Sequence, residues 1–110
     1  MPRCDPDLLV QDMLEATRRV ELYTAGLDQT AFRCDGKTID AVVRNLEVLG
    51  EAARRLPEDF IKRYSYVPWN KIAGLRNRIV HDYFGLDPDI IWQIIHHDLP
   101  LLRAQLETLV

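Results

Sequence analysis

The fold is set by residues 37–56, which read KTIDAVVRNLEVLGEAARRL. Apolar residues recur in this stretch at spacings of three and four, the period that places them on one face of an α-helix. The apolar positions are Ile39, Val42, Val43, Leu46, Leu49 and Ala53, and a separate charged stripe comprises Arg44, Glu47, Glu51 and Arg54. A glycine inside a helix costs about 1 kcal/mol relative to alanine. We therefore expect Gly50 to mark a close approach by another backbone.

Upstream of this helix, the same period predicts another one. Pro6 suits a first helical turn, Asp5 is a plausible cap, and Gly26 ends the helix. Its apolar stripe comprises Leu9, Met13, Ala16, Val20 and Tyr23. Residues 27–36 are short and mixed, and we expect a loop or a single turn there.

Downstream, residues 57–66 predict one or two helical turns, and residues 69–85 predict a third strong helix that Gly85 ends. The triplet Asp-Pro-Asp at 87–89 is a helix start signal, because it supplies a cap, a first-turn proline and an acid near the positive end of the helix dipole. Pro100 lies inside the last helical pattern, so we expect a kink near residues 96–98. The apolar positions of this helix are Ile91, Ile95, Leu99, Leu102, Leu106 and Leu109.

These patterns predict an all-α fold, an antiparallel bundle of four to five helices. No segment shows sustained strand alternation with enrichment in β-branched residues. The 110 residues fit one compact domain, which we expect to span residues 1–110.

The charge balance excludes a basic coat for nucleic acid. The chain has 14 Lys and Arg residues against 17 Asp and Glu residues, a net charge of -3. Binding to a polyphosphate needs surplus positive charge that releases counterions, so any nucleic-acid contact must use a local cluster. No apolar run approaches 18 residues, and the polar N-terminal residues do not resemble a signal peptide. We expect a soluble cytoplasmic protein with no membrane partner.

The cysteines and two of the histidines carry no metal signal. Cys4 and Cys34 have no Cys or His at metal-ligand spacing, and we expect free reduced thiols. His96 and His97 lie in the last helix, where we expect surface or boundary positions. No zinc-like spacing accompanies them.

The side chains best suited to catalysis lie in residues 69–85, which read WNKIAGLRNRIVHDYFG. On a helix, this stretch divides into stripes. The core stripe is Ile72, Leu75 and Ile79; a small or polar stripe is Asn70, Gly74, Asn77 and His81; a third is Trp69, Ala73, Arg76, Val80 and Tyr83. At the i−4 position, Asn77 can hydrogen-bond His81 and fix its ring.

Arg76 and His81 are five residues apart, which on a helix places them about 140° apart around the axis. One helix therefore makes a poor pocket of them. A second copy packed across a two-fold axis would bring two arginines and two histidines to one groove. Gly74 has no side chain and would permit such close packing.

A groove with two arginines and two histidines suits metal-independent cleavage of RNA phosphodiesters. Histidine changes charge near neutral pH and serves as base or acid. Arginine offers a planar fork for two phosphate oxygens. The residues alone leave an alternative open, in which Arg76 and Arg78 form a solvated face, His81 interacts with the helix dipole and Tyr83 packs in the core.

The motif Arg76-Asn77-x-x-x-His81-x-Tyr83 resembles the R-x4-H-x-Y form of the HEPN superfamily signature. The surrounding sequence resembles the HepT-like toxin family at Arg44-Asn45-Leu46-Glu47, at Gly50-Glu51-Ala52 and from Pro68 through Asn77. The resemblance covers nearly the whole chain, although residues before Lys37 match only in general character.

The resemblance implies an all-α HEPN domain that acts as a homodimer. It implies the toxin of a type VII-like toxin–antitoxin pair, with metal-independent endoribonuclease activity and no cofactor. Arg76 and His81 would be the catalytic pair, with Asn77 in support. The implied partner is a minimal nucleotidyltransferase antitoxin, MntA, which transfers AMP from ATP to the motif tyrosine, here Tyr83. Such a bulky anion two residues from His81 would block the groove and repel RNA phosphate.

Positive charge around the motif is gathered at Lys71, Arg76 and Arg78, so we expect Lys71 and Arg78 to contact RNA phosphate. The resemblance also allows a second reading, because some HEPN domains are non-catalytic binding or scaffold partners of nucleotidyltransferases. The intact Arg76 and His81 argue against that reading. A helical DNA-binding module fits less well, since the chain is acidic and has no basic recognition helix.

Overall fold

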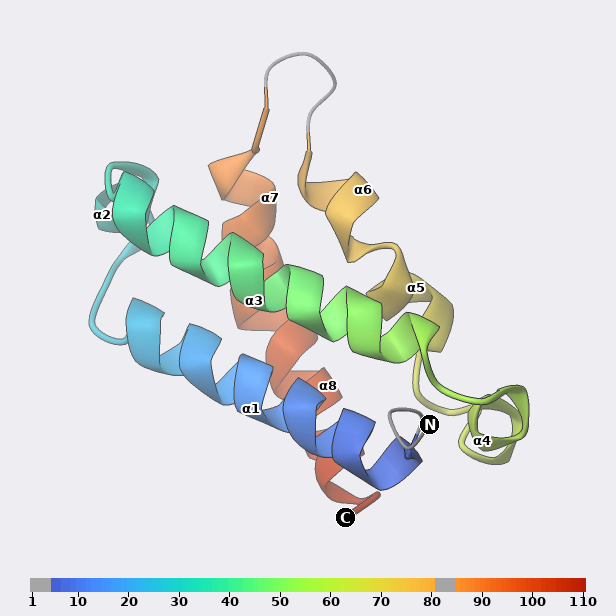
Figure 1. Ribbon diagram of the computed structural model, residues 1–110. Coiled ribbons are helices and arrows are strands. Elements are labelled where there is room, and N and C mark those ends of the chain that lie inside the picture. Colours follow the sequence, from blue (N-terminus) through green and yellow to red (C-terminus); the bar gives the residue numbers. More distant parts are fainter. Residues whose placement is uncertain (1–4, 81–84) are drawn as a thin grey trace.

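The computed structural model describes residues 5–80 and 85–110, and these are helical over most of their length (Figure 1). Two 19-residue helices, α1 (Pro6–Thr24) and α3 (Gly36–Arg54), run antiparallel and pack along each other. Within the described residues, β-structure is limited to one isolated bridge. The all-α prediction is confirmed.

Aspartates cap the N-termini of the first three helices. Asp5 accepts a hydrogen bond from the Asp7 amide at 2.9 Å, and Asp28 accepts one from Ala31 at 2.8 Å. The latter begins α2 (Gln29–Arg33), the single short helix that the sequence left open between residues 27 and 36. Gly26 has φ of 81°, a left-handed conformation that glycine adopts without steric cost, so the chain turns there after α1.

The predicted third helix is wrong in its extent. It is divided at Gly74 into α5 (Trp69–Ala73) and α6 (Leu75–Ile79), after a short α4 (Glu58–Arg63). Val80 is extended and pairs with Leu86 in an antiparallel bridge, and the Asp87 amide donates to the Ile79 carbonyl at 3.0 Å. These contacts between residues 79–80 and 86–87 of the same chain take the place of further helical turns, so the helix does not reach Gly85.

The C-terminal arm begins as predicted. Asp87 caps α7 (Pro88–Gln93), which continues through a π-helical turn, η3 (Ile94–Asp98), into α8 (Leu99–Glu107). Pro100 has no amide hydrogen to donate to the preceding turn. The wider turn spans residues 94–98 and so includes residues 96–98, near which a kink was expected. In this turn the Leu99 amide donates to the Ile94 carbonyl.

The core lies between α1, α3 and the C-terminal arm, and α5 and α6 close its side. Almost all the predicted apolar positions of the long helices are buried or half-buried, whereas Tyr23 is exposed. The largest fully buried side chains include Met13, Phe32, Leu46, Leu49, Ile79, Ile91, Ile94, Leu99 and Leu106. Among the described helices, none combines the length and the apolar character that crossing a membrane requires.

Candidate functional site

Arg76 lies at the surface because α6 turns the opposite face of the helix, with Leu75 and Ile79, into the core. Leu75 and Ile79 face the core, and the Arg76 side chain is 69% exposed. Its Nε lies 3.9 Å from Oε2 of Glu47 on α3. This distance exceeds a normal hydrogen bond, so the guanidinium is loosely paired and accessible to an anion.

A hollow of about 200 Å³ lies beside Arg76, between α3 and α5–α6. Its lining residues are Leu46, Glu47, Gly50, Glu51, Arg54, Ala73 and Arg76. The predicted close approach at Gly50 is confirmed here, because a Cβ at this position would lie 3.3 Å from the Ile72 carbonyl oxygen. The charged stripe of α3 therefore forms one wall of the hollow.

Two carboxylates, those of Glu47 and Glu51, and two guanidinium groups, those of Arg54 and Arg76, line the hollow. Arg54 donates to the Ala73 carbonyl and lies 3.6 Å from Glu51, so it ties α3 to α5. Glu47 faces Arg76 across the hollow. Arg54 therefore stabilises the contact between α3 and α5, whereas Arg76 is the cation that α6 contributes to the hollow.

The predicted hydrogen bond between Asn77 and His81 required a helix that continues to residue 81, and α6 ends before it. Asn77 is exposed, and its backbone N–H donates to the Gly74 carbonyl at 3.1 Å. His81 and Tyr83 lie outside the described residues. The i−4 hydrogen bond between Asn77 and His81 and the 140° separation of Arg76 and His81 required a helix through residue 81, but α6 ends at Ile79 and Val80 is extended. Gly74 joins α5 to α6 rather than lying on one continuous helix face.

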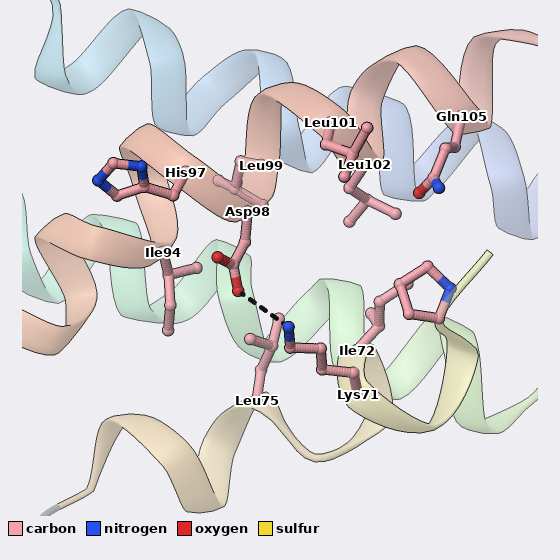
Figure 2. Close-up of a pocket in the computed structure, with 11 residues that line it drawn as sticks. Lys71, Ile72, Leu75, Ile94, His97, Asp98, Leu99, Leu101, Leu102 and Gln105 are labelled. Carbon is pink, nitrogen blue, oxygen red and sulfur yellow. Dashed lines mark ion pairs between the residues drawn. The ribbon is translucent and has the colours of Figure 1, made fainter.

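Lys71 and Arg78 converge on a single carboxylate, Asp98 in η3. Arg78 Nη1 donates to Asp98 Oδ2. The Lys71 Nζ lies 4.0 Å from the same oxygen, and Figure 2 shows this second pair. The Arg78 and Asp98 side chains are 36% and 27% exposed, whereas that of Lys71 is 62% exposed. These two cations are therefore paired on the C-terminal arm, while Arg76 faces α3.

The Lys71–Asp98 pair lies at the rim of a second hollow of about 110 Å³ (Figure 2). Its walls are mainly apolar and come from α5, α6, η3 and α8, with Ile72, Leu75, Ile94, Leu99, Leu101 and Leu102. Gln105 lines it as well, and its Oε1 is buried without a hydrogen-bond partner among the described residues.

The described residues contain no group of three or more His, Cys, Asp or Glu side chains placed to hold a metal ion. The predicted surface positions of His96 and His97 are confirmed. The His96 ring stacks on Trp92 with centroids 3.9 Å apart. Cys34 is an exposed free thiol, and Cys4 lies outside the described residues.

The sequence assigned no cation to two acidic neighbours of the predicted site. It left open whether Glu47 and Glu51 line a dimer groove or face solvent, and it did not connect Asp98 with the site. Asp98 is 20 residues from Arg78, so no local spacing connects them. Glu47 belongs to the charged stripe of α3, and that stripe was a signal, since it had no assigned surface to face. Which acid meets which cation depends on the packing of α3 and η3 against α5–α6.

Comparison with known proteins agrees with the resemblance seen in the motif. A family described as ribonuclease HepT-like matches residues 13–109. No solved structure matches the chain with significance.

Three relatives match over nearly the full chain. A protein of Methanocaldococcus jannaschii, provisionally named an RNase, is 39% identical over 100% of this chain and 91% of its own length. A protein of Thermococcus cleftensis named a probable ribonuclease HepT is 37% identical over 99% of this chain and 98% of its own. A second provisionally named RNase of M. jannaschii is 35% identical over 97% and 98%.

Proposed function

We propose that this chain, which belongs to the HepT-like ribonuclease family, is an endoribonuclease that cleaves RNA without a metal ion and acts as a homodimer. Family membership and the ribonuclease names of its relatives support ribonuclease activity. The observation that carries the chemistry is the exposed Arg76, held only loosely by Glu47.

In the proposed reaction, Arg76 exchanges Glu47 for the scissile phosphate. Its planar fork meets two phosphate oxygens and stabilises the charge that develops on them. His81 removes the proton of the 2′-hydroxyl, whose oxygen attacks phosphorus. The bond to the 5′-oxygen breaks, and this oxygen takes a proton from the partner subunit's His81. The products are a 2′,3′-cyclic phosphate and a 5′-hydroxyl, and no metal or water enters this step.

Three further residues support the substrate in this proposal. Asn77 lies next to Arg76 on the exposed side of α6 and is the proposed supporting residue. The sequence predicts Lys71 and Arg78 as further contacts to RNA phosphate, and in the unbound chain Asp98 pairs with both.

The homodimer supplies the second histidine. One chain has one histidine in the motif, and acid–base chemistry needs a base and an acid. Because α6 ends at Ile79, the proposal no longer depends on a helical angle between Arg76 and His81. It depends on the exposed surface of α6 and on Val80, the apolar residue that follows α6 and is 39% exposed.

The activity is tested by incubating the purified protein with single-stranded RNA in excess EDTA. We expect cleavage by the wild type and its loss in Arg76→Ala and His81→Ala, with unchanged helical circular dichroism. Arg18→Ala removes an exposed side chain on α1 and should cleave normally. Cleavage by the two site variants at the wild-type rate would refute the assignment. Binding to a nucleotidyltransferase without any cleavage would favour the scaffold function.

We further propose that the chain is the toxin of a type VII-like toxin–antitoxin pair. An MntA-like nucleotidyltransferase would neutralise it by transferring AMP to Tyr83. The added phosphodiester is anionic and lies two residues from His81, so it would repel RNA phosphate. Incubation with that enzyme and ATP should add one AMP mass to the wild type and to Tyr23→Phe, but none to Tyr83→Phe. Labelling at the exposed Tyr23 or Tyr66 instead would contradict this assignment.

A further inference from the structure

We propose that Asp98 controls which cations of α5–α6 reach RNA: Lys71 exchanges Asp98 for phosphate, whereas Arg78 stays with Asp98. This inference rests on the proposed ribonuclease function. It makes Asp98 a positioning residue, because it acts through Lys71 and Arg78 rather than on the substrate.

The Arg78–Asp98 pair is the stronger of the two. Arg78 donates a hydrogen bond directly to Asp98 Oδ2, and about two thirds of each side chain is shielded from water. Charge-assisted hydrogen bonds are stronger than neutral ones, and partial burial reduces screening by salt. A phosphate in solvent therefore competes poorly for Arg78.

The Lys71–Asp98 pair is weaker. The Nζ lies 4.0 Å from the same oxygen, beyond hydrogen-bond distance, and the lysine side chain is 62% exposed. Such exposed ion pairs contribute little to stability. When Lys71 leaves, Asp98 still has Arg78, so no carboxylate is left unpaired. Lys71 can therefore move to an RNA phosphate at low cost.

Asp98 is well placed for this role because its backbone is fixed. It ends the π-helical turn η3, between the buried Ile95 and Leu99. Arg78 precedes the buried Ile79 at the end of α6. The ion pair thus ties the last turn of α6, from which the chain leads to His81, to the C-terminal arm. Loss of the carboxylate should release a cation and also loosen α6.

Because the chain is acidic overall, RNA binding depends strongly on each cation that reaches a phosphate. With a net charge of -3, the chain has no general attraction for RNA, so binding depends on few phosphate contacts. For single strands, each contact contributes about 0.7 to the slope of log binding constant against log salt. This slope counts the cations that reach RNA.

The test measures binding of a fluorescein-labelled single-stranded RNA between 50 and 200 mM salt, in a His81→Ala background that prevents cleavage. We expect Asp98→Asn to steepen the slope by about 0.7, as Arg78 becomes available. Over this salt range, that is an additional loss of about 2.6-fold in affinity. Asp98→Glu keeps the charge and should retain the original slope. With His81 intact, Asp98→Asn should lower both kcat and KM, because the released Arg78 adds a contact to RNA. Loss of folded protein would lower the apparent kcat alone.

Glu15→Gln is the matched control. Glu15 also holds two cations, Arg18 at 2.6 Å and Arg19 at 3.0 Å, and its loss changes the net charge equally. It lies on α1, which packs against α3 and α8. We expect it to leave the slope unchanged. An equal steepening in Glu15→Gln and Asp98→Asn would overturn the proposal, because the effect would be one of net charge.

Two more variants distinguish the two cations. Arg78→Gln added to Asp98→Asn should restore the original slope. Lys71→Gln alone, at an exposed position that leaves folding intact, should make the slope shallower by about 0.7. An unchanged slope in Lys71→Gln would overturn the release of Lys71. If the His81→Ala protein binds no RNA and the wild type cleaves none, the proposed function itself fails. RNA binding whose slope is the same with and without the Asp98→Asn change refutes only the role of Asp98.

Discussion

At the scale of single residues, Arg76 differs from the other cations of its segment in what holds it. Arg78 is half-buried on Asp98, whereas Arg76 is mostly exposed and 3.9 Å from Glu47. A pair of that length and exposure adds little to stability. The position is therefore free to serve a ligand, and what it offers is the planar guanidinium.

Arg76→Lys tests the guanidinium itself. The charge remains, but the two-pronged contact with phosphate is lost, and arginine and lysine are not equivalent at such sites. We expect RNA cleavage to fall by roughly 100-fold, the size expected when one preorganised donor group is removed. Initial rates in EDTA give the comparison. Arg33→Lys, at another exposed arginine, should retain activity, and a fully active Arg76→Lys would show that charge alone suffices.

Glu15 provides a pH prediction away from the site. Hydrogen bonds from Arg18 and Arg19 lower the pKa of Glu15 from 4.5 to about 2. Because the pKa is lower in the folded state, the stabilisation is present above about pH 4.5 and is lost as the pH falls towards 2. The melting temperatures of the wild type and Glu15→Gln should therefore converge between pH 4.5 and 2. A carboxyl carbon of Glu15 that titrates near 4.5 by NMR would contradict the folded-state pairing.

At the scale of elements, the site depends on how α5 approaches α3. Gly50 permits this contact, because a side chain would meet the Ile72 carbonyl, and Arg54 bonds the next carbonyl. The backbone of α5 cannot move aside as a flexible side chain would. The position of α6 and Arg76 follows from this junction.

Gly50→Ala should therefore destabilise the protein, although alanine favours helix. The Cβ would lie 3.3 Å from the Ile72 oxygen, and we expect the free energy of unfolding to fall by about 1 kcal/mol or more. Gly36→Ala is the control, since a Cβ there meets nothing within 4 Å. That change should stabilise by about 0.4–1 kcal/mol. Urea unfolding measures both, and a stabilising Gly50→Ala would show that the α3–α5 junction has room to relax.

Sequence periodicity predicts the long elements well. The helices at α1 and α3, the start at Asp87 and the irregular turn before Pro100 agree with expectation, because each is set by local pattern and capping. The third helix was overextended, because the Val80–Leu86 bridge depends on a chain reversal that helical periodicity does not detect. For the site, the motif identifies Arg76, but its Glu47 partner and the Asp98 pairing arise from tertiary packing.

At the scale of the whole molecule, the central proposal is a site shared between two chains. Mixing wild type with a growing excess of His81→Ala tests it, because a mixed dimer keeps only one of the two His81 side chains that the reaction needs. We expect the activity per wild-type chain to fall towards zero as the excess grows, and sedimentation should show a dimer at micromolar concentration. A monomer in sedimentation, together with an unchanged activity per wild-type chain, would place the reaction within a single chain.

The reaction itself is tested most directly with two matched oligonucleotides in excess EDTA. One is all-RNA, and the other has 2′-deoxyribose at the position that the protein cleaves. The proposed attack by the 2′-hydroxyl predicts that the RNA is cut to a 2′,3′-cyclic phosphate and that the deoxy-substituted strand remains intact at that position. Cleavage of the substituted strand at the same position, or cleavage of the RNA only after Mg²⁺ is added, would contradict the account.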